Sequence, residues 1–419
     1  MMSKEELLEL VTQFYLDSYD FNGIPSYKLP KFMLSDLVEL IKEEKVFVLS
    51  ESKVNNIHIN CYNSYGSESE QIEAISNGVQ YAVYPAAQYL RTKNIQEKKP
   101  FTKMLMLGAE QFRILYFCVD VLEIYANNPQ YTFQDYGYVG NICVNSSADE
   151  NDPIHSEYIK DYGVAYPRTG PHDRDRAIGV FLRDLSKLNY QAQCKWMGFL
   201  LPDQEEFLVN HGFVQNLVYG EWVTKHWIFN SILEEIKFIN VLCRNIGIPQ
   251  LFCNEYSMDT QELIGYRIIL IPSLKNYYDF VSALEKIAIN NLNYKTFQKA
   301  APYICPIDRK KPDGSLKGSI EMLEEWMQQN YLSSIPNGAE YFKEDVSNTL
   351  RKIRKIRQVP AHELYSNQHD KSLYSKQNEL VKEVYCALER LRLIFSTHPK
   401  NKDIPLPNAL KDRTKIAIY

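Results

Sequence analysis

Two side chains near residue 360 have the types and spacing for acid–base chemistry on a phosphate. Arg357 and His362 lie in the stretch RQVPAH, with Pro360 between them. A guanidinium can bind the non-bridging oxygens of a phosphodiester, and an imidazole that titrates near neutral pH can take a proton from a ribose 2′-OH or give one to the leaving oxygen. Because RNA carries its own nucleophile, these two groups need no metal ion. The sequence therefore predicts Arg357 and His362 as catalytic residues.

A run of positive charges leads up to these two residues. Residues 351–357 read RKIRKIR in a chain whose net charge is −5. A phosphate backbone requires a local basic patch of this kind, although the same run could be only the solvated face of a surface helix. The predicted substrate contacts are Arg351, Lys352, Arg354, Lys355, Gln358, Tyr365, His369 and Lys371.

Helices are expected to position these side chains. Four segments after Pro272 have apolar residues at three- and four-residue spacing, namely residues 274–292, 318–332, 338–357 and 372–395. This pattern predicts an all-α four-helix bundle over residues 273–398. Pro360 cannot donate a backbone hydrogen bond and disfavours helical geometry at the preceding residue. A kink or break is therefore predicted between Arg357 and His362, and a break would direct both side chains into one cleft.

The predicted bundle and its motif resemble the HEPN superfamily of nucleotide-binding and RNA-cleaving helical bundles. The motif of that family is arginine and histidine separated by four to six residues, matched here by Arg357 to His362; Gln358 stands where active members commonly have Asn, Asp or His. The resemblance implies a homodimer with a composite site and a metal-independent endoribonuclease without cofactor. It also implies that Arg357 polarises the phosphate, that His362 is the acid and base, and that the protein is a toxin or an effector of abortive infection in phage defence.

A second arginine and histidine match the spacing of this motif. Arg392 and His398 lie at the end of the last predicted helix, just before Pro399. Cationic side chains are favoured at a helix C-terminus. We therefore interpret Arg392 and His398 as residues that stabilise a helix C-terminus, and not as a second catalytic pair.

The first two thirds of the chain predict a mixture of helices and strands. In residues 1–66, a helix over residues 3–19 with a Ser3–Glu6 capping box and a helix over residues 35–44 precede a hairpin of residues 45–50 and 56–62, the order of a winged-helix module. Residues 67–272 predict a mixed sensor or regulatory region, and residues 399–419 a tail. The predicted class is α+β, a mixed α/β N-terminal region followed by the helical bundle.

Particular elements are expected within the middle region. The patterns predict helices up to residue 127, β-rich stretches at residues 131–147 and 176–188, a helix over residues 219–247 and a strand over residues 266–273.

Two other stretches contain residue types found in active sites. Residues 171–176 read PHDRDR and could bind a metal or a phosphate, although alternating charge is typical of a solvated loop. Asp203, Glu235 and Lys237 have the residue types of a PD-(D/E)xK nuclease. That chemistry needs a strand, whereas residues 231–242 predict a helix.

The remaining signals narrow the class of protein. The eight cysteines form no C-x-x-C pair, and the chain contains no P-loop, dinucleotide-binding or nucleophile-elbow motif. His58 and His226 are expected to pack without a catalytic partner. We expect a cytoplasmic protein without a membrane segment that binds RNA, dimerises through the bundle and takes a regulatory ligand or protein on its N-terminal region. The alternative is a non-catalytic protein whose bundle only dimerises or binds nucleotides.

Overall fold

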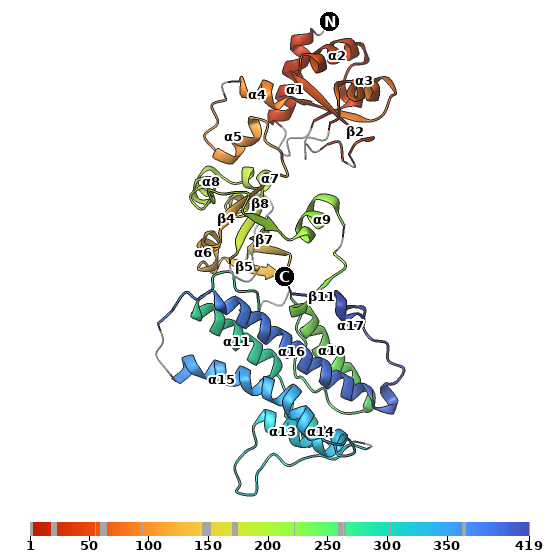
Figure 1. Ribbon diagram of the computed structural model, residues 1–419, viewed down its shortest axis with the longest axis vertical. Helices are drawn as coiled ribbons and strands as arrows, with labels where there is room; N and C mark the ends of the chain where they lie inside the picture. Colours follow the sequence, from red (N-terminus) through yellow and green to blue (C-terminus); the bar gives the residue numbers. More distant parts are fainter. Residues whose placement is uncertain are drawn as a thin grey trace. The chain divides into compact units, whose positions relative to one another are not determined.

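The structure, a computed structural model, combines antiparallel sheets with a helical C-terminal region (Figure 1). This confirms the predicted α+β class. The structure describes the chain apart from residues 1–2, 18–22, 55, 59–64, 94, 145–151, 170–174, 222, 259–262, 264, 302, 363–365 and 419, and apart from the side chains of Lys31, Asp135, Ala361 and His362.

The chain divides into two compact units. Residues 1–133, 141–168 and 177–209 form the first, which we call the sheet unit. Residues 134–140, 169–176 and 210–419 form the second, which we call the helical unit. The sequence predicts one middle region over residues 67–272, whereas residues 210–272 of that range belong to the helical unit. Neither unit is one continuous piece of sequence.

A three-stranded antiparallel sheet begins the sheet unit. β3 (Tyr81–Pro85) lies between β1 (Ile24–Pro25) and β2 (Val46–Ser50). Helices α1 (Lys4–Asp17), α2 (Leu34–Lys42) and α3 (Glu68–Ser76) share a hydrophobic core with these strands.

Two predictions about this part of the chain have different outcomes. The Ser3–Glu6 capping box is confirmed, because the Glu6 N–H donates to Ser3 Oγ at 3.2 Å and the Ser3 N–H donates to Glu6 Oε2 at 2.6 Å. The predicted hairpin is tested only in part: β2 pairs with β3, and the described part of the predicted second strand is not extended. Ile57 and His58 form a turn, and residues 59–62 lie outside the described residues.

A six-stranded sheet follows in the order β4-β8-β7-β6-β5, with β9 also paired to β7. Gly179 of β8 permits a close approach, because a Cβ at this position would lie 2.3 Å from Val209 Cγ1. The strands are β4 (Ile114–Cys118), β5 (Tyr131–Asp135), β6 (Val139–Val144), β7 (Asp161–Pro167), β8 (Ala177–Phe181) and β9 (Phe207–Val209). The short helices of this region are α4 (Ala87–Arg91), α5 (Pro100–Met106), α6 (Glu123–Ala126), α7 (Leu182–Ser186) and α8 (Tyr190–Met197), with 3-10 turns at Val119–Leu122 and Pro153–Ser156.

Long helices build the helical unit. α10 (Ile228–Ile246) packs along α16 (Ser372–Ser396), and α11 (Leu274–Ala288) packs along α15 (Asn348–His362) (Figure 1). α13 (Ser319–Met327) continues into a π turn at Gln328–Leu332, and α14 (Gly338–Phe342) runs through a π turn at Lys343–Ser347 into α15. Shorter elements are α9 (His211–Tyr219), α12 (Tyr294–Gln298), α17 (Asn408–Lys411) and the parallel pair β10 (His226–Trp227) and β11 (Ile416–Ala417).

Two expectations about the helical unit are wrong in whole or in part. Residues 266–273 form no strand, apart from an isolated bridge between Ser273 and His369. α15 continues through Pro360 to His362, so the chain does not break there, which is one of the two predicted forms. Pro360 falls in the last turn of α15, where the missing N–H leaves only one intrahelical bond unmade.

Candidate functional site

α15 places its apolar side against the core and its cations on the remaining surface. Leu350 and Ile353 are buried, and Ile356 is half-buried. The cations of residues 351–357 all keep some exposure to solvent. These cations differ in the acidic residues with which they form ion pairs. The ion pairs determine which of the cations can bind an anionic ligand.

A buried carboxylate joins two of the arginines. Glu285 of α11 has 8% of its side chain exposed, and its Oε1 lies 3.5 Å from Arg354 Nε. Its Oε2 lies 3.3 Å from Arg357 Nε. Arg357 nevertheless keeps 45% of its side chain exposed. Glu285 therefore holds two guanidinium groups together at the surface, and one of them belongs to the predicted catalytic residue.

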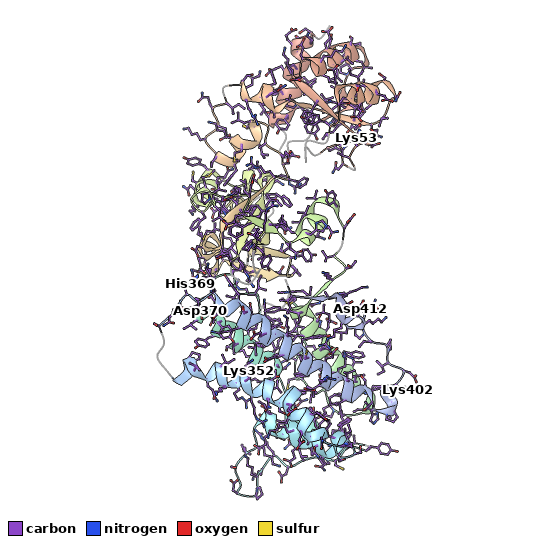
Figure 2. All side chains as sticks on the ribbon, in the orientation of Figure 1. Lys53, Lys352, His369, Asp370, Lys402 and Asp412 are labelled. Carbon is purple, nitrogen blue, oxygen red and sulfur yellow. The ribbon has the colours of Figure 1, made fainter. Side chains whose placement is uncertain are left out.

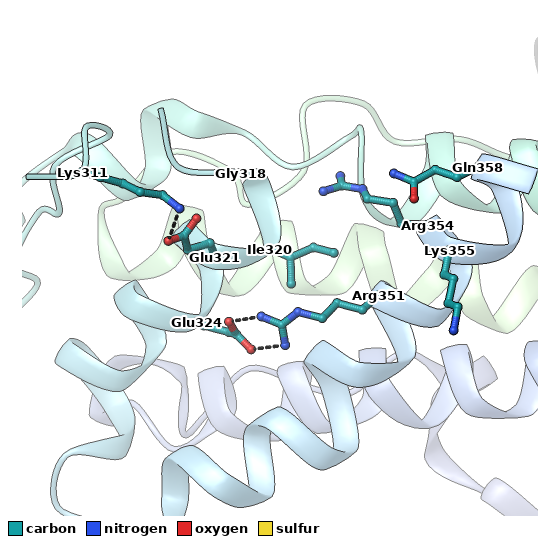
Figure 3. A pocket seen from close by; sticks show the side chains of 9 residues that line it. All are labelled: Lys311, Gly318, Ile320, Glu321, Glu324, Arg351, Arg354, Lys355 and Gln358. Atoms are coloured by element: carbon teal, nitrogen blue, oxygen red, sulfur yellow. Dashed lines mark hydrogen bonds and ion pairs between the residues drawn. The ribbon is translucent and has the colours of Figure 1, made fainter. Parts of the chain in front are cut away.

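A surface groove of about 550 Å³ lies beside these arginines, between α13 and α15, and we call it the α13–α15 groove (Figure 3). Its cationic residues outnumber its acidic ones by four to two. The lining residues are Lys311, Gly318, Ile320, Glu321, Glu324, Arg351, Arg354, Lys355 and Gln358.

Two ion pairs neutralise part of the groove's charge. Arg351 binds Glu324 with both terminal nitrogens, and its Nη1 lies 2.7 Å from Glu324 Oε1. Lys311 Nζ lies 3.0 Å from Glu321 Oε1 and lowers the pKa of that carboxyl below its ordinary value. Figure 3 shows both pairs at one side of the groove. The positive charge that remains comes from the other two lining cations.

Arg354 and Lys355 supply that charge. Arg354 Nη2 donates to Ser319 Oγ at the start of α13, at 3.1 Å. Lys355 is exposed and has no ion pair within the part of the chain that the structure describes. Figure 3 shows the Gln358 amide beside the Arg354 guanidinium, whereas the Lys355 side chain points away from both. Arg354 and Gln358 therefore present neighbouring hydrogen-bond donors at this end of the groove.

Other predicted contacts are engaged elsewhere. Lys352 Nζ lies 2.8 Å from Glu383 of α16, and Lys352 does not line the α13–α15 groove. Lys371 Nζ lies 2.6 Å from Asp175. His369 is exposed, and it lies in a loop beside the start of α11 through its bridge to Ser273 (Figure 2).

The histidine of the motif marks the end of α15. His362 is the last residue of the helix, but its side chain is not among those described. Tyr365 also lies outside the described residues.

Sequence reasoning missed Glu285, Ser319 and Lys311. Glu285 occupies the buried stripe of α11 beside Val281 and Leu284. A carboxylate in an apolar stripe is a signal for a buried ion pair, because an unpaired buried charge is costly. That signal does not say which cations form the pair.

Glu235 of the PD-(D/E)xK interpretation and Arg392 of the second motif match form an ion pair with each other. Glu235 lies on helix α10, as predicted, and it is buried 2.7 Å from Arg392 Nε of α16. Burial raises the pKa of Glu235 to about 7, although Arg392 opposes this rise. His398 caps the turn that follows α16, where its Nδ1 accepts from the Lys400 N–H at 3.2 Å. Arg392 therefore belongs to the α10–α16 interface.

Among the described residues, no group of three His, Cys, Asp or Glu side chains could hold a metal ion, and no helix is long and apolar enough to span a bilayer. Comparison with family models, with curated proteins and with solved structures returned no match.

Proposed function

We propose that the helical unit is a metal-independent endoribonuclease of the HEPN type, with Arg357 and His362 as its catalytic residues. One observation carries the proposal. Arg357 is anchored through Nε to the buried Glu285 carboxylate, yet 45% of its side chain is exposed. A guanidinium anchored through Nε keeps the edge formed by its two terminal nitrogens for a phosphate. Such an arginine is pre-organised for an anionic ligand.

The proposed reaction is transesterification within the RNA chain. The ribose 2′-oxygen attacks the neighbouring phosphorus, so that a P–O2′ bond forms and the P–O5′ bond breaks. A base accepts the 2′-OH proton, and an acid gives a proton to the departing 5′-oxygen; the His362 imidazole serves in this acid–base exchange. Arg357 stabilises the charge on the non-bridging oxygens. The products are a 2′,3′-cyclic phosphate and a 5′-hydroxyl.

We also propose that the enzyme acts as a homodimer. Positions 357 and 362 of one continuous helix lie about 140° apart around its axis, given 3.6 residues per turn. A site that combines an arginine from one chain with a histidine from its partner avoids this separation. In this proposal the sheet unit takes a regulatory ligand or protein, and the restrained nuclease acts as a toxin or in antiviral defence by abortive infection.

The test is RNA cleavage in EDTA by the full chain and by Arg357→Ala and His362→Ala. We expect both substitutions to reduce cleavage at least 100-fold, as is typical when an acid–base group is removed. The wild-type products should carry 2′,3′-cyclic phosphates. Circular dichroism checks that the variants are folded. An inert wild type, or variants that cut as well as it does, would contradict the proposal.

Binding without cleavage is the second candidate, and one observation favours it. Glu285 sits against both Arg354 and Arg357 and offsets part of their charge. An arginine whose charge is partly neutralised stabilises developing negative charge less strongly. A wild type that binds RNA but leaves it intact in EDTA, and also with added Mg²⁺ or Mn²⁺, would support this candidate.

A further inference from the structure

We infer that the α13–α15 groove is a subsite for the backbone of single-stranded RNA next to the phosphate at Arg357. The inference deepens the proposed function and rests on it for the position of the cleaved bond. The groove itself is defined by its own residues, and its ligand can be tested without any cleavage.

The charge of the groove selects an anion. Lys311 and Arg351 are neutralised by Glu321 and Glu324. Arg354 shares the single Glu285 carboxylate with Arg357, and Lys355 has no ion pair among the described residues, so positive charge remains at the end lined by Gln358. Arginine and lysine with an amide donor are a usual set of phosphate contacts. A phosphate group at this end would meet the Arg354 and Gln358 donors, and Lys355 of the same stretch of α15 adds a positive charge to the lining of the groove.

Arg354 connects this end of the groove with the proposed catalytic arginine. Its guanidinium lines the groove and also lies against Glu285, the carboxylate that holds Arg357. Arg354 and Arg357 are three residues apart on α15, which corresponds to about 4.5 Å along the helix axis. One strand can therefore contact both positions through neighbouring phosphates.

The size and lining of the groove indicate a single strand and little base selectivity. A volume of about 550 Å³ is within the range of small-molecule sites, so the groove admits one nucleotide unit. A groove that holds one nucleotide unit fits a single strand rather than the two paired strands of a duplex. Among the described residues that line the groove, none carries an aromatic ring on which a base could stack. Contacts would then be made mainly to the phosphate backbone, independently of sequence.

The test measures binding of a labelled single-stranded 2′-O-methyl oligonucleotide, which lacks the nucleophile and cannot be cut. Fluorescence anisotropy at several salt concentrations gives the affinity and its salt dependence for the full chain. The variant is Lys355→Ala. The matched control is Lys352→Ala, which removes the same charge three residues earlier, from a lysine paired with Glu383 outside the groove.

We expect Lys355→Ala to weaken binding about fivefold and to reduce the slope of log K against log salt by about 0.7, the value for one phosphate contact on a single strand. Lys352→Ala should leave the slope unchanged. Gln358→Glu puts a negative charge at the same end of the groove and should weaken RNA binding more than Lys355→Ala does. This variant replaces Lys355→Ala in the test if Lys355→Ala does not fold. Duplex RNA should compete poorly.

Three results would overturn the inference. They are equal slopes for the Lys355 and Lys352 variants, competition by duplex RNA or by inorganic phosphate as strong as that of the single strand, and no binding by the wild type. Failure of the proposed function is recognised separately. If the wild type cuts no RNA but Lys355→Ala reduces the slope of log K against log salt as expected, the RNA-binding groove is supported and the proposed nuclease activity is contradicted.

Discussion

Glu285 decides how the two arginines at the candidate site are arranged. Two guanidinium groups three residues apart on one helix repel each other, and the carboxylate between them offsets this repulsion. A buried carboxylate needs such partners in return, because an unpaired buried charge is unstable. The anion site and the packing of α11 on α15 therefore depend on the same residue.

Glu285→Gln removes the charge and keeps the shape of the side chain. We expect the free energy of unfolding to fall by about 1 kcal/mol, since both arginines are partly hydrated. RNA cleavage should fall about 10-fold, because Arg357 loses its anchor. Urea unfolding and cleavage assays measure the two effects.

Glu383→Gln is the matched control for this substitution. Glu383 pairs with Lys352 on another side of α15, so the loss of its charge should leave cleavage unchanged and cost less than 1 kcal/mol. Cleavage by Glu285→Gln at the wild-type rate would show that Arg357 does not need the carboxylate.

The sequence indicates the cations of the candidate site but not their partners. Residues 351–357 stand out because charge is a local property of the sequence. Ion pairs with Glu285, Glu324 and Glu383 depend on how α11, α13 and α16 pack against α15. That packing brings together residues 27 to 72 positions apart, so no local pattern contains it.

At the scale of elements, the interface between α10 and α16 contains a buried ion pair. Glu235 is fully buried 2.7 Å from Arg392, and burial raises the pKa of Glu235 from its ordinary 4.5 to about 7. The folded chain therefore binds this proton more tightly than the unfolded chain does. The contribution of Glu235 to stability is fully present below pH 4.5 and is lost as the pH rises through 7.

Glu235→Gln should remove this pH dependence. For the wild type, we expect the free energy of unfolding to fall by up to about 3 kcal/mol between pH 4.5 and pH 7 relative to the variant. Urea unfolding at several pH values measures the difference. Glu383→Gln, which changes an exposed carboxylate, should follow the wild-type profile. Parallel profiles for the wild type and Glu235→Gln would mean that Glu235 is ionised throughout this range.

Helices and strands are predicted correctly where the apolar pattern repeats over a long segment, and less well where the apolar run is short. α11 and α16 follow the predicted segments because their apolar stripes extend over many residues. α10 ends where predicted, but it begins at Ile228, nine residues after the predicted start at residue 219. The helix expected to end at residue 127 is instead β4 followed by a 3-10 turn and the short α6. The apolar run ILYFC in β4 is compatible with a helix or a strand. Pairing within the surrounding sheet stabilises the strand.

At the scale of the whole molecule, the helical unit is assembled from distant parts of the sequence. Residues 169–176 connect β7 to β8 of the sheet unit but belong to the helical unit. Within that segment, Arg176 is buried, donates to the Ile269 carbonyl and lies 4.2 Å from the ring centre of Tyr374 on α16. The sequence shows this segment only as a loop of alternating charge, because its partners lie about 90 to 200 residues away.

Arg176→Ala should destabilise the start of α16. We expect a loss of about 2 kcal/mol, from a desolvated cation–π contact and one hydrogen bond. Urea unfolding gives the magnitude, and hydrogen exchange should show faster exchange at the first turns of α16. Lys371→Ala, which removes only the exposed pair with Asp175, should cost less than 1 kcal/mol. Equal losses in the two variants would contradict the importance of the buried arginine.

The discontinuous helical unit also limits how the gene can be divided. Recombination at residue 210 would transfer the long helices but leave Arg176 behind with the sheet unit. The recipient protein would then expose the ring of Tyr374 and an unbonded Ile269 carbonyl. We therefore expect the two units to have been inherited together, and exchanges that preserve function to include residues 169–176.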